Sequence, residues 1–369
     1  MDFALTETQS GLRDLAARIF SEQATQDRLR TLDSKGYFDS ALWQQLADSG
    51  LLGITLNENE GGVGEDFETL CVLLEEAGRH VAPLPLLEVL VGGVLALQGL
   101  PRAPWQAQVF AALSRGEVVL CGAPYEPGKR APLASTAVAQ SQGDGWKLRG
   151  SKHLVAAADL PGKCWTLARD EEGLGLYLFD LQDGGVHRER QVDTTGAYLY
   201  RLELEDVPAQ RLAGPEETKQ FIERSQLYGL AASSALAVGV CSEMTRMAAA
   251  YTSEREQFGK PIATFQAVSH RLADCYIDTE ALRVLSQQAV CRLNQGGVSA
   301  EAREAVLVAK IFASEALHRV SHGTQQVHGG TGVDRDYPLF RYCLLAKKLE
   351  LHIASQGELL QQLGADLAA

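Results

Sequence analysis

The chain of 369 residues is long enough for two or three domains, and its 46% hydrophobic and 22% charged residues are typical of a soluble globular protein. Its formal net charge of −13 and the lack of a basic stripe argue against a general nucleic-acid-binding role. The N-terminus lacks the basic start and apolar run of a signal peptide, and the most apolar early stretch, residues 84–97, is too short to span a bilayer, so we expect a cytoplasmic protein without membrane contact.

Residues 1–115 are predicted to form an N-terminal helical domain, because apolar residues recur there at helical spacing. Thr6, followed by an acidic first turn, is typical of a helix cap. Residues 61–64, Gly-Gly-Val-Gly, indicate a loop, and residues 67–78 indicate a second amphipathic helix.

Residues 116–213 are predicted to form a middle antiparallel β domain. The runs in this region are short, often alternate between apolar and polar residues, and are separated by glycine and aspartate turns. The expected strands cover residues 135–139, 145–149, 164–168, 175–181 and 198–204. Residues 206–209, Asp-Val-Pro-Ala, are expected to lead back into helix.

Residues 214–369 are predicted to form a C-terminal four-helix bundle. The region contains long amphipathic segments with short connections, at residues 218–253, 265–295, 300–323 and 338–362. The expected fold class is therefore mixed α and β, with a helical domain, an antiparallel β domain and a helical bundle in chain order.

The stretch from residue 251 to residue 266 is the most informative part of the chain. Arg255 and Phe258-Gly259 are expected to close one helix, residues 260–262 to form a turn, and Phe265-Gln266 to open the next helix. A planar guanidinium at a helix end, beside an aromatic ring and a turn, suits an anionic, planar cofactor.

This stretch resembles the flavin-adenine-dinucleotide (FAD) signature of the acyl-CoA dehydrogenase family, and four further motifs resemble landmarks of that family in the same order. These are residues 61–64, Gly150-Ser151-Lys152, residues 204–214, and Gln326-Val-His-Gly-Gly-Thr-Gly332 followed by Tyr337-Pro338. The resemblance covers essentially the whole chain. It implies FAD as cofactor, an acyl-CoA thioester as substrate, and an electron-transfer flavoprotein or similar protein as electron acceptor.

The resemblance also implies six residues that contact the adenosine and pyrophosphate part of an FAD whose flavin ring lies in a neighbouring subunit. They are Arg255, Phe258, Gln266, Gln326, Gly329 and Gly330. Arg255 would bond the pyrophosphate, and the two glycines would let the backbone approach the cofactor. Structural alternatives stay open, with Arg255 as a solvated charge, Phe258 as a core residue and the glycines as a tight turn.

The carboxylate base that the family uses is missing from both places where the resemblance puts it. The position counted from the late glycine motif is Ile353, and the alternative on the first bundle helix is Gly229. Glu350 lies one turn before Ile353, but we expect it to form local ion pairs with neighbouring lysines. The catalytic residue is therefore unknown from the sequence.

The flavin-ring side departs from the family's pattern as well. The loop at residues 122–129 lacks the family's Ser-Asp pair. Leu154 and Ala156 stand where the resemblance implies an aromatic residue behind the ring and a hydroxyl that bonds it. The chain keeps the half of the cofactor site that it would lend to a neighbour and lacks the half that it would use itself.

We therefore hypothesise that the chain is the base-lacking subunit of a heteromeric acyl-CoA dehydrogenase, arranged as α2β2 with a related chain that carries the glutamate. The family includes such enzymes in steroid side-chain breakdown. Two alternatives stay open: a self-sufficient homo-oligomer with a displaced base such as Glu350, and a flavin-free scaffold with the same fold. The acyl chain is not predicted, although small residues at 229–240 would leave room for a bulky one.

Other chemistry has weak support in the sequence. The seven cysteines are scattered without C-x-x-C spacing, which indicates neither a disulfide framework nor a zinc site. His318 and His322 are four residues apart, but no acidic partner follows in an HExxH-like pattern, so no metal site is expected. The chain has no Gly-x-Ser-x-Gly elbow and no P-loop.

Overall fold

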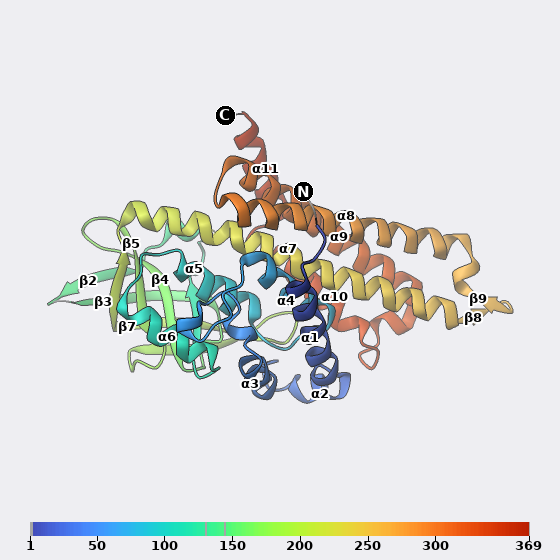
Figure 1. Ribbon diagram of the computed structural model, residues 1–369, viewed down its shortest axis with the longest axis horizontal. Helices are drawn as coiled ribbons and strands as arrows, with labels where there is room; N and C mark the ends of the chain where they lie inside the picture. The colour runs from blue at the N-terminus through green and yellow to red at the C-terminus, as the bar shows by residue number, and fades with distance from the viewer. Residues whose placement is uncertain (1–2, 130, 144, 369) are drawn as a thin grey trace. The chain divides into compact units, whose positions relative to one another are not determined.

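The computed structural model describes residues 3–129, 131–143 and 145–368, and its contacts divide the chain into two compact units. The first unit comprises Met1–Thr31, Asp66–Pro83 and Leu230–Ala369, and the second comprises Leu32–Glu65 and Leu84–Gly229. Along the chain, helices, strands and helices follow one another in the predicted order (Figure 1). The predicted boundaries after residues 115 and 213 fall between elements of different type, and the division into three domains stays a prediction.

The first unit is built mainly of long helices. Its elements are α1 (Glu7–Gln23), most of α2 (Gln26–Leu32), α4 (Phe67–Arg79), the greater part of α7 (Pro215–Glu254), α8 (Gln266–Gly296), α9 (Ala300–His328), α10 (Leu339–Leu351) and α11 (Gln356–Ala368). Helices α8 and α9 pack along each other, α10 and α11 pack on α9, and α1 packs on α4. The cap predicted at Thr6 is confirmed, since its side chain accepts a hydrogen bond from the Gln9 N–H at the start of α1.

A small hairpin and two short 3₁₀ segments complete this unit. The hairpin strands β8 (Glu256–Gln257) and β9 (Lys260–Pro261) lie at the far end of α7 and α8 in Figure 1. The 3₁₀ segments are η5 (Ile262–Thr264), before α8, and η6 (Gly329–Val333), directly after α9.

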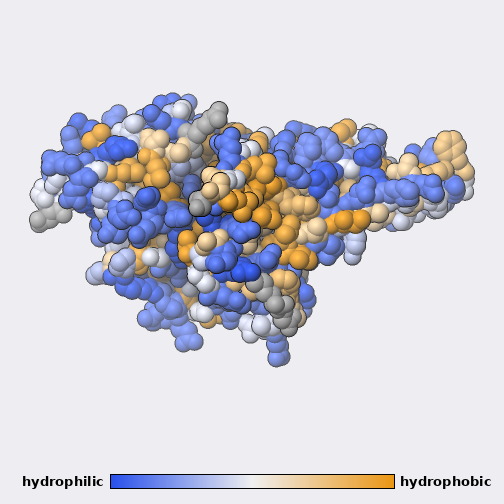
Figure 2. Space-filling view, turned by 90° about the horizontal axis from the view of Figure 1, so that it is seen from above, coloured by the Kyte–Doolittle hydropathy of each residue, from blue (hydrophilic) through white to orange (hydrophobic). Residues whose placement is uncertain are grey.

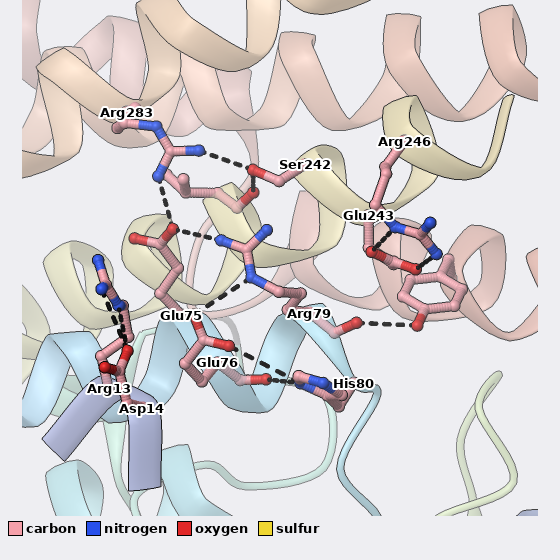
Figure 3. Close-up of polar contacts among 12 residues, drawn as sticks. Arg13, Asp14, Glu75, Glu76, Arg79, His80, Ser242, Glu243, Arg246 and Arg283 are labelled. Atoms are coloured by element: carbon pink, nitrogen blue, oxygen red, sulfur yellow. Dashed lines mark hydrogen bonds and ion pairs between the residues drawn. The ribbon is translucent and has the colours of Figure 1, made fainter. Parts of the chain in front are cut away.

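Helix α4 crosses α7 at a contact that only glycine permits. A Cβ added at Gly239 of α7 would lie 1.9 Å from the Glu75 carbonyl oxygen, so the two backbones touch there. Beside this contact the Glu75 carboxylate accepts from Arg79 at 2.9 Å and from Arg283 of α8 at 2.5 Å, and Arg283 also donates to Ser242 of α7 at 2.8 Å (Figure 3). The ion-pair network therefore joins three helices around one close backbone contact.

The predicted fourth bundle helix, residues 338–362, is wrong, because α10 ends at Leu351 and α11 begins at Gln356. The side chain of Lys310, on α9, is fully buried, and its ammonium donates to the Leu349 carbonyl oxygen at 2.7 Å. The Ser314 hydroxyl donates to the Glu350 carbonyl oxygen at 3.0 Å. These long-range donors satisfy carbonyls at the end of α10, where the chain turns.

The predicted helix over residues 300–323 is too short, because α9 continues to His328. Gly323 does not stop the helix. A Cβ at this position would lie 2.6 Å from the Cys275 sulfur of α8, so the glycine allows α8 and α9 to pack closely.

The second unit holds the β-sheet and the helices that belong to it. The helical elements are α3 (Ser40–Asp48), α5 (Ala96–Gln98), α6 (Pro104–Ser114), the π-helix η3 (Leu87–Leu95), and the 3₁₀ segments η1 (Leu51–Gly53), η2 (Glu58–Glu60) and η4 (Pro132–Ala134). The strands are β1 (Val119–Ala123), β2 (Val138–Gln142), β3 (Gly145–Ala156), β4 (Gly162–Arg169), β5 (Leu174–Asp180), β6 (Val186–Val192) and β7 (Tyr198–Ala213).

The prediction of a β domain between two helical regions is confirmed, although β1 and β6 were not among the expected strands and β2 lies three residues later than the strand expected at 135–139. Strand β1, which the sequence did not indicate, pairs with β4 in parallel, and β2 joins β4 in parallel at one position, while the other ladders of the sheet are antiparallel. Residues 206–209 lie inside β7 instead of leading into helix. Pro208 is tolerated there because the β3–β7 register shifts beside it and Asp206 has a φ of 55°, as at a β-bulge.

Helix α7 is long and apolar enough to cross a membrane by length and composition alone. However, 83% of its most apolar window is buried inside the protein. A helix at the core of a globular protein meets the same criterion of length and composition, because the rest of the protein buries its apolar residues.

Candidate functional site

The hairpin after α7 presents Arg255 and Phe258 at the surface of the first unit. The Arg255 backbone N–H donates to the Tyr251 carbonyl at 2.9 Å, and the Arg255 carbonyl accepts from the Ile262 N–H at 2.9 Å. Phe258 and Gly259 form the loop between β8 and β9 with φ values of 55° and 77°, the positive values that a two-residue hairpin turn needs. A positive φ is strained for an aromatic residue, so the fold holds Phe258 in this position at a cost in stability.

This geometry excludes one of the alternatives left open by the sequence. Phe258 is 92% exposed, so it is not a core residue. Figure 2 shows hydrophobic residues at the surface of the same end of the molecule. Arg255 is exposed, and within the described part of the chain no carboxylate pairs with it. The turn predicted at residues 260–262 lies at Phe258-Gly259 instead, because Lys260 and Pro261 pair with β8.

The glycine turn after α9 lies beside the last turns of α7. Gly329 has a φ of 60°, and a Cβ added at Gly329 or Gly330 would meet nothing within 4 Å, so the backbone there is open to a ligand. The Tyr251 hydroxyl lies 3.4 Å from the Thr331 hydroxyl, which joins α7 to the turn. Two sequence-distant parts of the predicted cofactor site are therefore neighbours.

All six predicted cofactor-contacting residues are exposed and lie in the first unit. Gln266 is in the first turn of α8, after the hairpin, and Gln326 is in the last turn of α9. An uncompensated guanidinium, an exposed ring and an open glycine backbone fit the pyrophosphate and nucleoside of an anionic dinucleotide. Sequence reasoning missed Tyr251, whose hydroxyl joins the last turn of α7 to the glycine turn.

In the second unit, the loop at residues 122–129 is tied down by a buried ion pair. Lys152 of β3 is fully buried, and its ammonium donates to the Glu126 carboxylate at 2.7 Å. Burial opposes ionisation of Glu126, but hydrogen bonds from Lys152, Ser135, Ala137 and Thr136 outweigh it and lower the pKa of Glu126 to about 2. Glu126 and Lys152 therefore serve the fold, which leaves both charges unavailable to a ligand.

The strand after Lys152 carries the two replaced flavin-ring positions. The β3–β7 register shifts between Lys152 and Val155, and Leu154 has a φ of 57° and is 52% exposed. Its backbone N–H donates to the Gln191 side chain at 3.4 Å. Ala156 is buried. Neither side chain offers a ring face or a hydroxyl, so the residues present do not fit the flavin ring as the family's pattern would hold it.

Neither position that the resemblance implies for the base carries a carboxylate, and the first of them, Ile353, lies in the turn between α10 and α11. Ile353 has a φ of 70° in this turn, and Gly229 is buried in α7. The Glu350 carboxylate accepts from the Lys347 ammonium at 2.8 Å, which confirms the predicted local ion pair, and it lies 3.6 Å from His318. Glu350 is therefore held by neighbouring charges.

Across residues 3–129, 131–143 and 145–368, no group of three or more His, Cys, Asp or Glu side chains is arranged to hold a metal ion. His318 and His322 do lie close, with ring centroids 4.5 Å apart.

Similarity to known proteins extends over the whole chain. The family model of the acyl-CoA dehydrogenase C-terminal domain matches residues 227–351, and that of the N-terminal domain matches residues 6–103. Acyl-CoA dehydrogenase FadE27 of Mycobacterium tuberculosis is 32% identical over 379 residues, which cover 100% of this chain and 99% of the relative.

Two solved structures share both sequence and fold with the chain. A variant of the Tcur3481-Tcur3483 steroid ACAD is 39% identical with a TM-score of 0.89, covering 98% of each chain. The ChsE4-ChsE5 complex from Mycobacterium tuberculosis is 31% identical with a TM-score of 0.90, covering 100% of this chain and 99% of the other.

Proposed function

Because this chain belongs to the acyl-CoA dehydrogenase family of FAD-dependent oxidoreductases acting on CH–CH bonds, we propose that it is the base-lacking subunit of a heteromeric acyl-CoA dehydrogenase. The observation that carries the proposal is a contrast within one chain. Arg255, Phe258 and the Gly329-Gly330 turn are exposed and open to a ligand, whereas the position that the family resemblance implies for the base is occupied by Ile353.

In this proposal the chain lends its exposed residues to an FAD whose ring lies in a partner. The Arg255 guanidinium forms charge-assisted hydrogen bonds to the pyrophosphate, and the Gly329-Gly330 backbone lies against the nucleoside. When bound, FAD supplies the hydride acceptor for the α,β-dehydrogenation of the acyl thioester. The related partner chain supplies the glutamate that removes the α proton.

The proposed partner is a related acyl-CoA dehydrogenase chain, in an α2β2 heterotetramer. Two similar structures are described as assemblies of two differently named chains, Tcur3481-Tcur3483 and ChsE4-ChsE5, and the first is described as a steroid ACAD. From these similarities we propose that the substrate is an acyl-CoA with a bulky or steroid side-chain acyl group. A cytoplasmic location and an electron-transfer flavoprotein or similar acceptor belong to the same proposal.

The visible absorption spectrum of the purified protein tests this function against its two rivals. We expect no flavin with the chain alone, and flavin at about half occupancy per chain after co-expression with a related chain that carries the glutamate. Stoichiometric flavin in a homo-oligomer would favour a self-sufficient enzyme with a displaced base. Absence of flavin with every partner would favour a scaffold.

Arg255→Ala is the matching substitution. It removes charge-assisted hydrogen bonds, so FAD affinity of the assembled complex should fall roughly tenfold or more. Arg13→Ala is the control, because Arg13 is an exposed arginine of the same unit that pairs with the adjacent Asp14 at 3.1 Å (Figure 3). Equal FAD occupancy in the two variants would contradict the proposal.

A further inference from the structure

Three aromatic side chains lie together between Arg255 and the Gly329-Gly330 turn, the two parts of the proposed site for the adenosine and pyrophosphate of FAD (the cofactor tail). Tyr251 of α7 stacks on His328, with ring centroids 4.5 Å apart and planes 27° apart. Tyr337, which follows η6, lies edge-on to Tyr251 at 6.2 Å and tilted against His328 at 5.1 Å. Tyr251, His328 and Tyr337 are called the aromatic triad below.

Hydrogen bonds select one tautomer of His328. Its Nδ1 lies 2.7 Å from the Thr324 carbonyl oxygen, which can only accept, so Nδ1 carries the hydrogen. Its Nε2 lies 3.1 Å from the Tyr337 hydroxyl and therefore accepts from it in the neutral ring. His328 is only 3% exposed, and burial lowers its pKa from the usual value of 6.5, which favours this neutral form.

The triad also has covalent and hydrogen-bonded connections to both parts of the site. The Tyr251 carbonyl accepts from the Arg255 backbone N–H at 2.9 Å, and its hydroxyl lies 3.4 Å from the Thr331 hydroxyl. His328 directly precedes Gly329, the residue that opens the glycine turn. A shift of the His328 ring would therefore move Gly329 relative to Arg255.

Resting on the proposed function, we propose that the aromatic triad is a positioning element, which sets the spacing between Arg255 and the Gly329-Gly330 turn so that both engage one dinucleotide. The three rings touch no ligand themselves in this role. Two groups that bind different parts of one ligand bind it well only if the protein structure between them holds them at a fixed spacing. The neutral His328 supplies that rigidity through two directional hydrogen bonds and one stacked face.

Tyr337→Phe tests the role with the smallest change, because it removes only the hydroxyl that donates to His328. The control is Tyr342→Phe, which removes a tyrosine hydroxyl that donates to the Arg79 carbonyl at 2.8 Å, in the same unit and outside the triad. FAD dissociation constants are measured by flavin fluorescence on the complex of the full chain with its co-expressed, glutamate-bearing relative. We expect Tyr337→Phe to weaken FAD binding about fivefold, the worth of one hydrogen bond, and Tyr342→Phe to leave it unchanged.

A pH profile separates positioning from simple packing. Protonation of His328 replaces the Nε2 lone pair with an N–H, so Tyr337 can no longer donate to it. Because burial lowers the pKa of His328 from 6.5, wild-type FAD affinity should fall only at pH values below 6.5. His328→Phe keeps a ring but loses both hydrogen bonds, so its weaker affinity should not vary over this range. The groups that face the triad are Thr324 and Thr331 and, around Tyr337, the charged side chains of Arg246, Glu243 and Glu254. These charged side chains are present in both the wild type and His328→Phe, so any effect of their titration is common to the two proteins.

The outcomes are distinguishable. If Arg255→Ala strips FAD while Tyr337→Phe binds it as tightly as Tyr342→Phe does, the positioning role is overturned and the proposed function stands. If Arg255→Ala binds FAD as tightly as Arg13→Ala does, both are overturned. A fivefold loss of FAD affinity in Tyr337→Phe, with a thermal unfolding midpoint no lower than that of Tyr342→Phe, supports the role.

Discussion

Replacement of Gly239 by alanine tests the close crossing of α4 and α7 in the first unit. The added Cβ would lie 1.9 Å from the Glu75 carbonyl oxygen and 2.7 Å from the Arg79 backbone nitrogen. Both neighbours are backbone atoms, so no rotation of a side chain relieves the contact. The helices must separate, and the bond from Arg283 to Glu75, 2.5 Å in the wild type, lies on the same crossing.

The expected magnitude follows from two opposing effects. Alanine is the better helix former and favours the folded state by about 0.5–1 kcal/mol where space is free. Overpacking of a rigid contact typically costs about 1–3 kcal/mol, and contacts this short belong at the upper end. We therefore expect Gly239→Ala to lower the free energy of unfolding by about 2 kcal/mol, which for a chain of 369 residues corresponds to a fall in melting temperature of roughly 2–3 °C.

Urea unfolding of the full chain, followed by circular dichroism, measures this change, and Gly11→Ala is the matched control. Gly11 is exposed within α1 of the same unit, and a Cβ there would meet nothing within 4 Å. Gly11→Ala should therefore stabilise the protein by up to about 1 kcal/mol. A Gly239→Ala variant as stable as Gly11→Ala would refute the argument that the two helices meet backbone to backbone.

Two further predictions concern the buried ion pair and the base position. Glu126→Gln leaves the Lys152 ammonium buried without its counter-charge and should cost about 3–5 kcal/mol at pH 7, whereas the exposed Glu117→Gln should leave stability unchanged. Since the pKa of Glu126 is lowered to about 2 from 4.5, its contribution is full above pH 4.5 and is lost as the pH falls toward 2, so unfolding free energies of wild type and Glu126→Gln should converge in acid. Ile353→Glu restores a carboxylate at the base position but not the flavin-ring contacts, so the chain alone, given FAD, a steroid acyl-CoA and an artificial electron acceptor, should show no turnover. Turnover by that single chain would contradict the argument that Leu154 and Ala156 do not fit the flavin ring.

Local signals account for most of what could be predicted about the site. Arg255, Phe258 and Gly329 were identified from short motifs, because a helix end, a turn and a glycine pair each leave a pattern within a few residues. The contact between Tyr251 and Thr331 left no such pattern, since the two residues are far apart in the chain and meet only when α7 and α9 pack. The pairing of Lys152 with Glu126 also left no local pattern, because the two residues are distant in sequence and their charges are buried together only in the folded chain.

By itself, the sequence determined the order of helical, β and helical regions, the motifs of the cofactor tail, and the absence of a carboxylate at residues 229 and 353. Periodicity, turn residues and residue identity are local properties, which a linear chain carries in full. The tertiary structure decided where α10 stops, because Lys310 reaches its carbonyls from another helix. It also decided that β1 pairs in parallel with β4, and that the segment from Asp66 to Pro83 joins the C-terminal helices in one compact unit. Each of these depends on contacts between residues distant in sequence, whose free energy exists only once the chain has folded.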